Sequence, residues 1–398
     1  MPASAPNSQQ EMRRRNLSRV LRTVAEQAPV SRAGIAARVG LTRAAVSTLV
    51  DELLRGGLLT ELGPGRTGGV GRPGHALDVG ARGPCGIGAD VGVDRLAVVA
   101  LDLRGRVRAR AEAEGDHRDS DPDEVLARLA ALVEETAAGA AGHGLAPAGL
   151  AVAVPGLVGR DSTRVVRTPN LGWPATDLRP RLPRTLPLTV DNEANFGALA
   201  ELWHGGAEAP ADFVHVSARI GIGGAVVLGG ELLRGARGFA GELGHVPVVP
   251  EGRPCGCGGR GCLEQYAGEE ALLGAAGLPA GHASPRSRTA VLAERAAQGD
   301  AAALRALRDA GRALGVALAG TVNLLDPEAV VLGGELAGLG RFLLPALTGE
   351  LASRQTAPAP VPRLLTSAVG TDGPVLGAAR SVVRAVLDDP MAYAPARA

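Results

Sequence analysis

Apolar residues near the start of the chain recur at the spacing of one helix face. Between residues 13 and 27 they occupy positions i, i+3, i+4 and i+7, at Leu17, Val20, Leu21 and Val24. This period favours an amphipathic helix over a strand, in which apolar residues would alternate. Pro29 cannot continue a helix, so it predicts where this one ends.

Two shorter predicted helices follow, each with a start and a stop signal. Ser31 and Thr42 are placed to accept hydrogen bonds from the first free backbone amides of these helices. Gly40 ends the second helix and Gly56 the third, because glycine adopts the backbone conformations at which helices stop. The predicted inward-facing residues are Ile35, Ala36 and Val39 in the second helix, then Val46, Leu49, Val50, Leu53 and Leu54 in the third.

Three short helices with a glycine-containing turn between the last two are typical of a helix-turn-helix. The third helix would then enter the major groove of DNA with its N-terminal half, where Arg43, Ser47 and Thr48 face outward. Arg32, at the start of the second helix, is a further candidate for contact with DNA. The alternative is a plain three-helix bundle whose polar face meets only solvent.

Two short predicted strands, at residues 58–62 and 75–79, flank a loop rich in glycine and proline. The loop carries Arg66 and Arg72, which suit contact with phosphate or with the minor groove of DNA. A strand, a loop and a strand after a helix-turn-helix predict the winged form of that motif. The alternative for the loop is a disordered linker.

From residue 86 onward, predicted strands alternate with a predicted helix. Runs of apolar residues predict strands at 86–92, 95–101 and 150–154, and residues 123–141 have the period of a helix. Alternating strands and helices indicate an α/β architecture for this larger second part of the chain.

Three polar or glycine-rich motifs lie in or beside strands of this part. Asp90 has the strand–turn–strand setting of the phosphate-binding hairpin of actin-like kinases. Residues 191–195 stand between a strand and a helix, where their polar groups meet a ligand or merely cap the helix. The glycines of residues 221–224 permit close approach of the backbone to phosphate, or form an ordinary tight turn.

Charge divides the chain in the same way as the hydrophobic pattern. The 398-residue chain has a net charge of +1, but residues 1–75 hold 11 arginines and five acidic residues, a net charge of +6. A basic segment joined to a mildly acidic remainder predicts a polyanionic partner for the first part alone, unless the asymmetry is chance. Aromatic residues make up only 2% of the chain, so the core must rely on leucine, valine and alanine.

The N-terminal residues lack the apolar stretch of a signal peptide, and no apolar run approaches the roughly 20 residues of a membrane span. We therefore expect a cytoplasmic protein without a membrane partner. In a reducing compartment, clustered cysteines bind metal rather than form disulfides.

The most specific motif contains one histidine and three cysteines. His245, Cys255, Cys257 and Cys262 lie within 18 residues, with glycines between them that let a loop wrap an ion. Three thiolates and one imidazole fill the tetrahedral coordination of Zn²⁺ and leave no open position for catalysis. The sequence therefore predicts a structural zinc site rather than free thiols, and an ordinary core role for the isolated Cys85.

These motifs together resemble the ROK family (repressors, open reading frames and kinases), in particular its repressor branch, typified by the xylose repressors. The likeness rests on Gly-Glu-Leu-Gly-His at 241–245, the cysteine-rich run at 255–264 and Gly-Arg-Pro at 71–73. It implies a winged helix-turn-helix followed by a two-lobed actin-like (ribonuclease H-like) α/β fold. The implied domains are a DNA-binding domain at 12–80, a first lobe at 84–190 plus 377–390, and a second lobe with the zinc loop at 191–376.

The resemblance also implies a sugar site in the cleft between the lobes. The family's sugar-contacting positions fall on Asn170, Asn192, Glu193, Glu242, His245 and Glu264, so His245 would serve both the sugar and the zinc ion. Carboxylates and amides suit this role because they form hydrogen bonds with neighbouring hydroxyl groups, and such a site rejects analogues that lack them.

Departures from the family's kinases indicate that no catalytic residue is retained. Asp94 stands where a threonine is expected beside the phosphates of ATP, and an acidic group repels phosphate. Glu193 replaces the aspartate that deprotonates the sugar, and a base displaced by about 1 Å loses on the order of 100-fold in rate. Arg219-Ile220 replaces the Gly-Thr of the second phosphate loop, although Asp90 persists.

The sequence therefore predicts a non-enzymatic repressor of a sugar-utilisation operon, whose DNA binding a small-molecule sugar relieves. Its operator would be palindromic double-stranded DNA, bound by a homodimer or homotetramer. One alternative is an ATP-dependent, glucokinase-like sugar kinase with an appended DNA-binding domain. Another is an activator, or a repressor that uses the sugar as corepressor.

Overall fold

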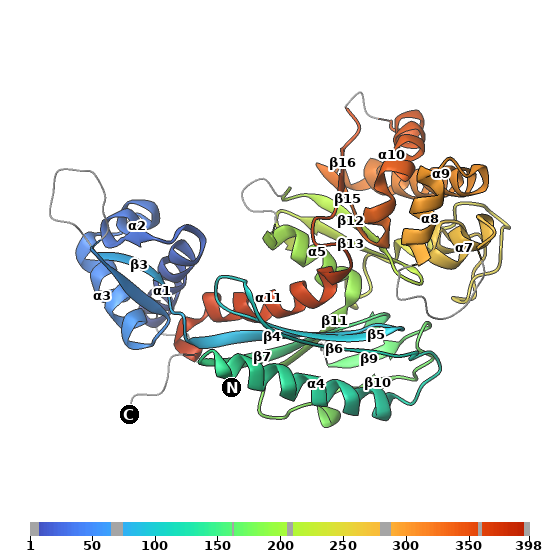
Figure 1. The fold of residues 1–398 in the computed structure, drawn as a ribbon. Coiled ribbons are helices and arrows are strands. Elements are labelled where there is room, and N and C mark those ends of the chain that lie inside the picture. Colours follow the sequence, from blue (N-terminus) through green and yellow to red (C-terminus); the bar gives the residue numbers. More distant parts are fainter. Residues whose placement is uncertain are drawn as a thin grey trace, which may run out of the picture.

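Two five-stranded sheets form the body of the molecule, and a small helical module lies at one end (Figure 1). This arrangement is that of a computed structural model, which describes residues 8–64, 75–160, 163–204, 210–278, 288–356 and 360–393. Helices pack against both sheets, so the α/β class predicted from the sequence is confirmed.

The N-terminal module contains three helices and a three-stranded antiparallel sheet of order β1-β3-β2. Its elements are α1 (Ser8–Gln27), β1 (Val30–Ser31), α2 (Arg32–Val39), α3 (Arg43–Arg55), β2 (Leu59–Pro64) and β3 (His75–Val79). The helices and the two longer strands overlap the predicted ranges, although α1 begins at Ser8, five residues before the predicted start. Strand β1 is too short to carry a pattern. The two arginines of the predicted wing, Arg66 and Arg72, lie outside the described residues.

Capping and a glycine define the turn between α2 and α3. The Ser31 hydroxyl accepts a hydrogen bond from the Gly34 amide, and the Thr42 hydroxyl accepts one from Ala45, both at 3.2 Å. Gly40 ends α2 in the left-handed conformation, with a φ of 66°. The chain bends by 114° between the two helices, within the roughly 90–120° of a helix-turn-helix.

The inner face of each helix in the module is buried, as its apolar period requires. The buried residues on these faces are Leu17, Val20, Leu21, Val24, Ile35, Ala36, Val39, Val46, Leu49, Val50 and Leu53. Leu54, predicted as core, is only partly buried and packs at the edge of this cluster.

The first large sheet has the strand order β11-β7-β4-β5-β6. Its strands are β4 (Gly83–Val91), β5 (Arg95–Leu101), β6 (Val107–Glu114), β7 (Leu145–Val154) and β11 (Leu188–Asn192). Strands β4, β7 and β11 are parallel, and β5 and β6 extend the sheet in antiparallel fashion. Helix α4 (Pro122–Gly142) covers one face, where it buries Leu96, Val98 and Ala100. Cys85 is buried in the same cluster, as predicted.

The second large sheet has the order β14-β13-β12-β15-β16. Its strands are β12 (Phe213–Ala218), β13 (Ile222–Leu228), β14 (Glu231–Leu232), β15 (Ala329–Gly334) and β16 (Arg363–Thr366). Helices α9 (Ala301–Leu325) and α10 (Glu335–Arg354) cover one face, against Val214, Val216 and Leu332. Below, the first lobe means the first sheet with α4, and the second lobe means the second sheet with its covering helices.

Helices α5 (Glu193–His204) and α11 (Gly373–Asp388) lie between the two sheets (Figure 1). Helix α11 packs on the face of the first sheet opposite α4, against Ala97, Val99 and Leu101. Helix α5 packs on the second sheet beside Phe213, and its Phe196 clusters with Ala378 of α11. The two lobes are therefore joined through a shared pair of helices.

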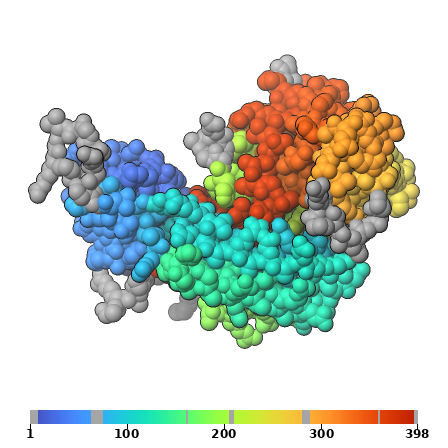
Figure 2. Space-filling view, viewed as in Figure 1, coloured from blue at the N-terminus to red at the C-terminus, as the bar shows by residue number. Residues whose placement is uncertain are grey.

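Helix α11 also reaches the N-terminal module. Val383, Val386 and Leu387 belong to the same apolar cluster as the inner faces of α1, α2 and α3. Arg22 of α1 pairs with Asp388, and Arg14 pairs with Asp389 at 3.2 Å. The module projects from one end of the molecule beside the first lobe (Figure 2).

The remaining elements are short or lie at the edges of the lobes. They are β8 (Leu157–Val158), β9 (Arg164–Arg167), β10 (Thr176–Asp177), η1 (Arg179–Arg181), η3 (Leu243–His245), α6 (Glu264–Ala267), α7 (Glu269–Ala275), α8 (Arg288–Ala297), η4 (Gly370–Asp372) and η5 (Pro390–Ala392). Within the described ranges, no single helix is long and apolar enough to cross a membrane. Only α2 and α3 taken together pass that test of length and composition, and they are sharply bent.

Glycines allow α11 to approach its neighbours closely. A Cβ atom on Gly88 of β4 would lie 2.3 Å from both the Ala379 nitrogen and the Val375 oxygen. A Cβ atom on Gly377 of α11 would lie 1.9 Å from the Phe196 oxygen of α5. Backbone therefore packs directly on backbone at these crossings, and no side chain fits between.

Gly377→Ala should destabilise the protein by about 1–3 kcal/mol, because the new methyl group must push α11 away from α5. The measurement is the midpoint of urea unfolding. The matched control is Gly349→Ala in α10, where a Cβ atom meets nothing within 4 Å. The control should be neutral or stabilising by up to about 1 kcal/mol, since alanine favours a helix. Equal midpoints for the two variants would contradict the close packing.

Candidate functional site

The predicted metal ligands converge in one loop of the second lobe. The ligand atoms of His245, Cys255, Cys257 and Cys262 all lie within 4.8 Å of one another. His245 Nδ1 is 3.7 Å from Cys255 Sγ, and Cys257 Sγ is 3.7 Å from Cys262 Sγ. A tetrahedron with metal–sulfur bonds of about 2.3 Å has edges of about 3.8 Å, so these spacings suit an ion at the centre.

The backbone of the loop favours a thiolate at Cys257. The Gly259 amide donates a hydrogen bond to Cys257 Sγ at 3.4 Å, and this bond lowers the pKa of Cys257. Burial raises the pKa of Cys262 to about 12. Gly258 has a φ of 95°, a left-handed conformation that lets the chain turn between Cys257 and Cys262.

His245 links this cluster to the predicted sugar residues. While Nδ1 faces the thiols, Nε2 lies on the other side of the ring, 3.8 Å from the Glu242 carboxylate. Burial raises the pKa of Glu242, although the histidine opposes the shift. Glu264 directly follows the cysteine run, and its charge also acts on Glu242. Glu242, His245 and Glu264 therefore gather in one place.

The turn between β12 and β13 packs against this group. Glu264 Oε2 accepts a hydrogen bond from the Ile222 amide at 3.3 Å. A Cβ atom on Gly221 would lie 2.2 Å from Glu264 Oε2 and 3.3 Å from Asn170 Nδ2. Asn170 comes from the first half of the chain, so the turn brings it to the same region as Glu264.

Two further predicted sugar residues have protein partners in this structure. Asn192 Nδ2 donates to the Gly156 oxygen at 2.8 Å, and its Oδ1 accepts from the Ala194 amide at 2.7 Å. Both polar atoms of Asn192 thus position the end of β11 and the start of α5. Glu193 Oε2 accepts a hydrogen bond from Arg219 at 3.2 Å.

Arg219 joins two buried carboxylates, those of Asp90 and Glu193, in one charge cluster. Its Nη1 donates to both carboxylate oxygens of Asp90, at 3.0 and 3.2 Å, in addition to Glu193. Burial raises the pKa values of Asp90 and Glu193, and Arg219 opposes both shifts. Burial alone would lower the pKa of Arg219, but the two carboxylates outweigh it and raise that pKa. The cluster is therefore a mutually dependent set of buried charges.

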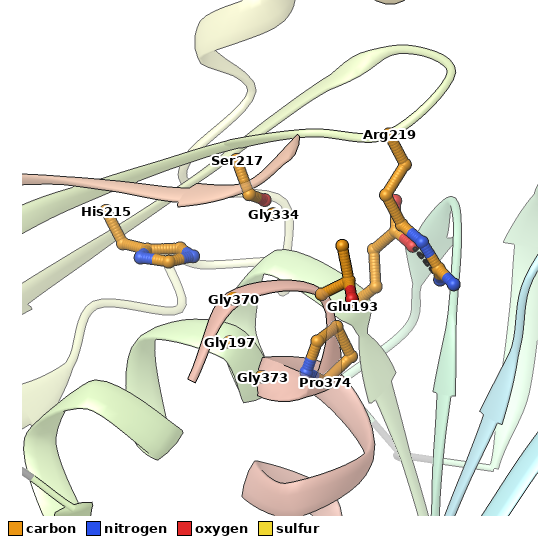
Figure 3. Close-up of a pocket in the computed structure, with 10 residues that line it drawn as sticks. Glu193, Gly197, His215, Ser217, Arg219, Gly334, Gly370, Gly373 and Pro374 are labelled. Atoms are coloured by element: carbon orange, nitrogen blue, oxygen red, sulfur yellow. Dashed lines mark hydrogen bonds and ion pairs between the residues drawn. The ribbon is translucent and has the colours of Figure 1, made fainter. Parts of the chain in front are cut away.

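A small pocket adjoins this cluster (Figure 3). His215, Ser217 and Arg219 follow one another along β12 and its turn, and Glu193 lies between them and the segment 370–374. His215 is buried, and its Nδ1 has no hydrogen-bond partner among the described residues. Burial lowers the pKa of His215 to about 4, so its ring is neutral near pH 7.

On the N-terminal module, the predicted DNA-contacting residues differ in solvent exposure and in the hydrogen bonds that they already form. Arg43 and Thr48 are exposed on α3, and Ser47 is partly buried beside them. Arg32 instead donates to Glu61 at 2.7 Å and to Asp51 at 2.9 Å within the module. A contact between Arg32 and DNA would therefore require it to exchange these partners.

Sequence reasoning missed the partners of Arg219 and the position of His215. The pairing of Arg219 with Asp90 joins residues 129 positions apart, which no local pattern reveals. His215 did carry a signal, since it shares the alternating face of β12 with the buried Phe213. A polar residue on a buried strand face marks a cavity or a partner.

Comparisons with known proteins cover nearly the whole chain. The Bacillus subtilis protein named xylose repressor is 30% identical over 381 residues, which span 94% of this chain and 96% of that protein. A solved ROK family transcriptional regulator, described as a homologue of the E. coli MLC protein, covers 96% of this chain and 98% of its own, with 27% identity and a TM-score of 0.77. A ROK family glucokinase from Streptomyces griseus, solved with glucose and AMPPNP, covers 75% of this chain and 98% of its own, with 26% identity and a TM-score of 0.64.

A family model supports the same assignment. The model described as "ROK family" matches residues 86–385, which is well over half of the chain and includes both lobes and the cleft residues above. The resemblance inferred from the cysteine-rich motif is therefore confirmed, and the chain belongs to the ROK family.

Proposed function

We propose that the protein is a sugar-responsive transcriptional repressor. Residues 12–80 would bind a DNA operator, and the cleft between the lobes, at 84–190 plus 377–390 and at 191–376, would bind a sugar that relieves repression. The observation that carries this proposal is the similarity to a xylose repressor over 94% of the chain, because it includes the N-terminal module as well as the lobes.

The geometry of the module supports a role in DNA binding. A three-residue turn and a bend of 114° join α2 to α3, as in a winged helix-turn-helix. Arg43 and Thr48 are exposed on the first turns of α3, where a recognition helix meets base edges. Ser47, Arg32 and the wing residues Arg66 and Arg72 complete the proposed interface with DNA. A palindromic operator would be read by a homodimer or homotetramer.

The cleft supports the sugar-binding part of the proposal. Glu242, His245 and Glu264 lie together, and Asn170 approaches Glu264 beside Gly221. Their oxygen and nitrogen atoms suit hydroxyl groups, and Asn192 and Glu193 would extend the site towards α5. The proposal requires the sugar to favour one arrangement of the lobes over another. The alternative is a sugar that acts as corepressor instead of inducer, by favouring the arrangement that binds DNA.

The donor set supports zinc as the metal of the cysteine-rich loop. Cys255, Cys257 and Cys262 would bind through sulfur, and His245 through Nδ1, which fills a tetrahedral site. The ion would keep the thiols deprotonated and fix the orientation of the imidazole. His245 would then hold its proton on Nε2, the nitrogen that faces Glu242, and offer it to a sugar hydroxyl.

The charge cluster supports binding without catalysis. The runner-up function is an ATP-dependent sugar kinase, and a similar glucokinase belongs to the same family. In this chain Glu193, which stands at the family's position for the catalytic base, is paired with Arg219. The guanidinium occupies Glu193 Oε2, so that oxygen would have to leave Arg219 before it could accept a proton from a sugar hydroxyl. Asp94 and Arg219 also occupy positions at which the kinases hold phosphate.

The test of the proposal is capture of genomic DNA fragments by the purified full chain, with and without a panel of mono- and disaccharides. One or a few operator fragments should be retained and then released by one class of sugar. Arg43→Ala should weaken binding to the operator by about 1–3 kcal/mol if Arg43 contacts a base. Arg308→Ala, an exposed arginine on α9, is the control and should bind normally. Unchanged operator binding by the Arg43 variant would count against α3 as the recognition helix.

Purified protein should contain one zinc ion per chain, measured by inductively coupled plasma mass spectrometry. Cys257→Ser should lose the ion and weaken sugar binding, because the loop also positions Glu264. Cys85→Ala, which changes a buried cysteine outside the cluster, should retain one zinc ion. Full sugar affinity in a metal-free protein would contradict the proposed role of the ion.

A sugar that stabilises the protein in a thermal-shift screen should not be phosphorylated. With magnesium and ATP present, the amount of sugar phosphate formed should stay far below that expected from the roughly 1–100 s⁻¹ of working kinases. Glu242→Ala should abolish the thermal shift, since it removes a hydroxyl-binding carboxylate, whereas Glu270→Ala on the exposed side of α7 should not. Turnover at a kinase-like rate would make the runner-up function the correct one.

A further inference from the structure

Arg219 connects elements that belong to different parts of the molecule. It lies in the turn that joins β12 to β13 of the second sheet, whereas Asp90 lies in β4 of the first sheet and Glu193 begins α5. The Asp90 side chain is completely buried, and those of Arg219 and Glu193 are each 17% exposed. One guanidinium therefore spans the inner end of the cleft between the lobes.

The fit of Arg219 depends on the absence of a side chain opposite it. A Cβ atom on Gly92, in the turn after β4, would lie 2.9 Å from Arg219 Nη2. The guanidinium is thus held between the backbone of the first lobe and the two carboxylates. Asp94 in that turn and Arg95 at the start of β5 also act on Asp90 through their charges, and Asp94 acts on Glu193.

The two buried carboxylates need an opposing charge beside them. Asp90 and Glu193 repel each other, and neither is exposed enough for water to screen the repulsion fully. Arg219 of the second lobe supplies the opposing charge to Asp90 of the first lobe and to Glu193 of α5 between them. In this arrangement of the lobes, both carboxylates are compensated by Arg219.

The same turn holds part of the predicted ligand site. Two residues after Arg219, Gly221 lies against Glu264 and Asn170, and the Ile222 amide donates to Glu264. A change in the position of Arg219 would move this short segment and its contacts together. Closure of the lobes and the placement of Glu264 are therefore mechanically linked.

We propose that Arg219 is the contact that holds the two lobes closed, a positioning residue that acts through Asp90 and Glu193. The apolar packing of α5 and α11 joins the lobes at their base, so the cleft opens about that base when the Arg219 contact is lost. This inference concerns the lobes themselves and holds whichever ligand the cleft takes.

The test measures the distance between the lobes in the full chain. Spin labels carried by unnatural amino acids replace Glu134 on α4 and Thr348 on α10, which are both exposed, so the native cysteines stay unlabelled. Pulsed electron paramagnetic resonance should give one short distance for the protein with Arg219 intact. Arg219→Met should add a longer distance and lower the closed-to-open ratio about tenfold to a hundredfold, as expected for the loss of charge-assisted hydrogen bonds.

Three further variants make the result decisive. Arg219→Lys, which keeps the charge but not the planar guanidinium, should give an intermediate ratio. Arg312→Met, which removes an ion pair formed within α9, should leave the distance unchanged. The triple variant Asp90→Asn, Glu193→Gln and Arg219→Met leaves no buried carboxylate uncompensated and should fold. It should still open, because the contact between the lobes is absent.

Two outcomes would overturn the proposal. If Arg219→Met keeps the short distance alone, Arg219 does not hold the lobes closed. If Arg219→Met opens but the triple variant stays closed, repulsion between Asp90 and Glu193 causes the opening, and Arg219 is not a positive contact.

Discussion

The direct packing of α11 on the backbone of β4 is the constraint on which the rest of the structure depends. Gly86 and Gly88 leave no room for even a methyl group beneath α11, and Gly377 does the same where α11 crosses α5. Because the helix lies this close, its 16 residues contact three parts of the molecule. It covers the first sheet, packs on α5 beneath the second sheet, and contributes to the core of the N-terminal module. Loss of that fit would disturb both lobes and the module together.

Local patterns predicted the N-terminal module well, because its structure depends on residues that are close in sequence. The period of Leu17, Val20, Leu21 and Val24 and the caps at Ser31 and Thr42 all reflect interactions within a few residues. The cysteine-rich loop was equally accessible, since its four ligands lie within 18 residues. The packing of α11 and the partners of Arg219 were not accessible, since they join segments more than a hundred residues apart.

The cleft residues show that knowing which residues form a site predicts less about their roles than knowing their contacts does. The six sugar residues were predicted from the family resemblance, and the structure places them in different surroundings. Glu242, His245 and Glu264 lie together beside the cysteine cluster, whereas both polar atoms of Asn192 bind backbone, at Gly156 and at Ala194. Glu193, at the start of α5 between the two sheets, accepts a hydrogen bond from Arg219 in the turn between β12 and β13. Asn192 and Glu193 therefore already have hydrogen-bond partners within the protein, and a ligand would either replace these partners or bind beside them.

The position of α11 also limits how a ligand in the cleft can affect the N-terminal module. At one end, Asp372 precedes α11 and pairs with Arg110 of β6 at 2.8 Å, and the first residues of the helix line the pocket beside Arg219. At the other end, Asp388 pairs with Arg22 of α1. A 16-residue helix spans about 24 Å and is stiff over that length, so a tilt at the cleft end displaces the other end.

In the proposed repressor, a small displacement of the N-terminal module would suffice to weaken DNA binding. The two halves of an operator present their grooves at a fixed separation, so a misplaced recognition helix loses its contacts. A coupling of about 1–3 kcal/mol between sugar and DNA is within the range that such a shift provides.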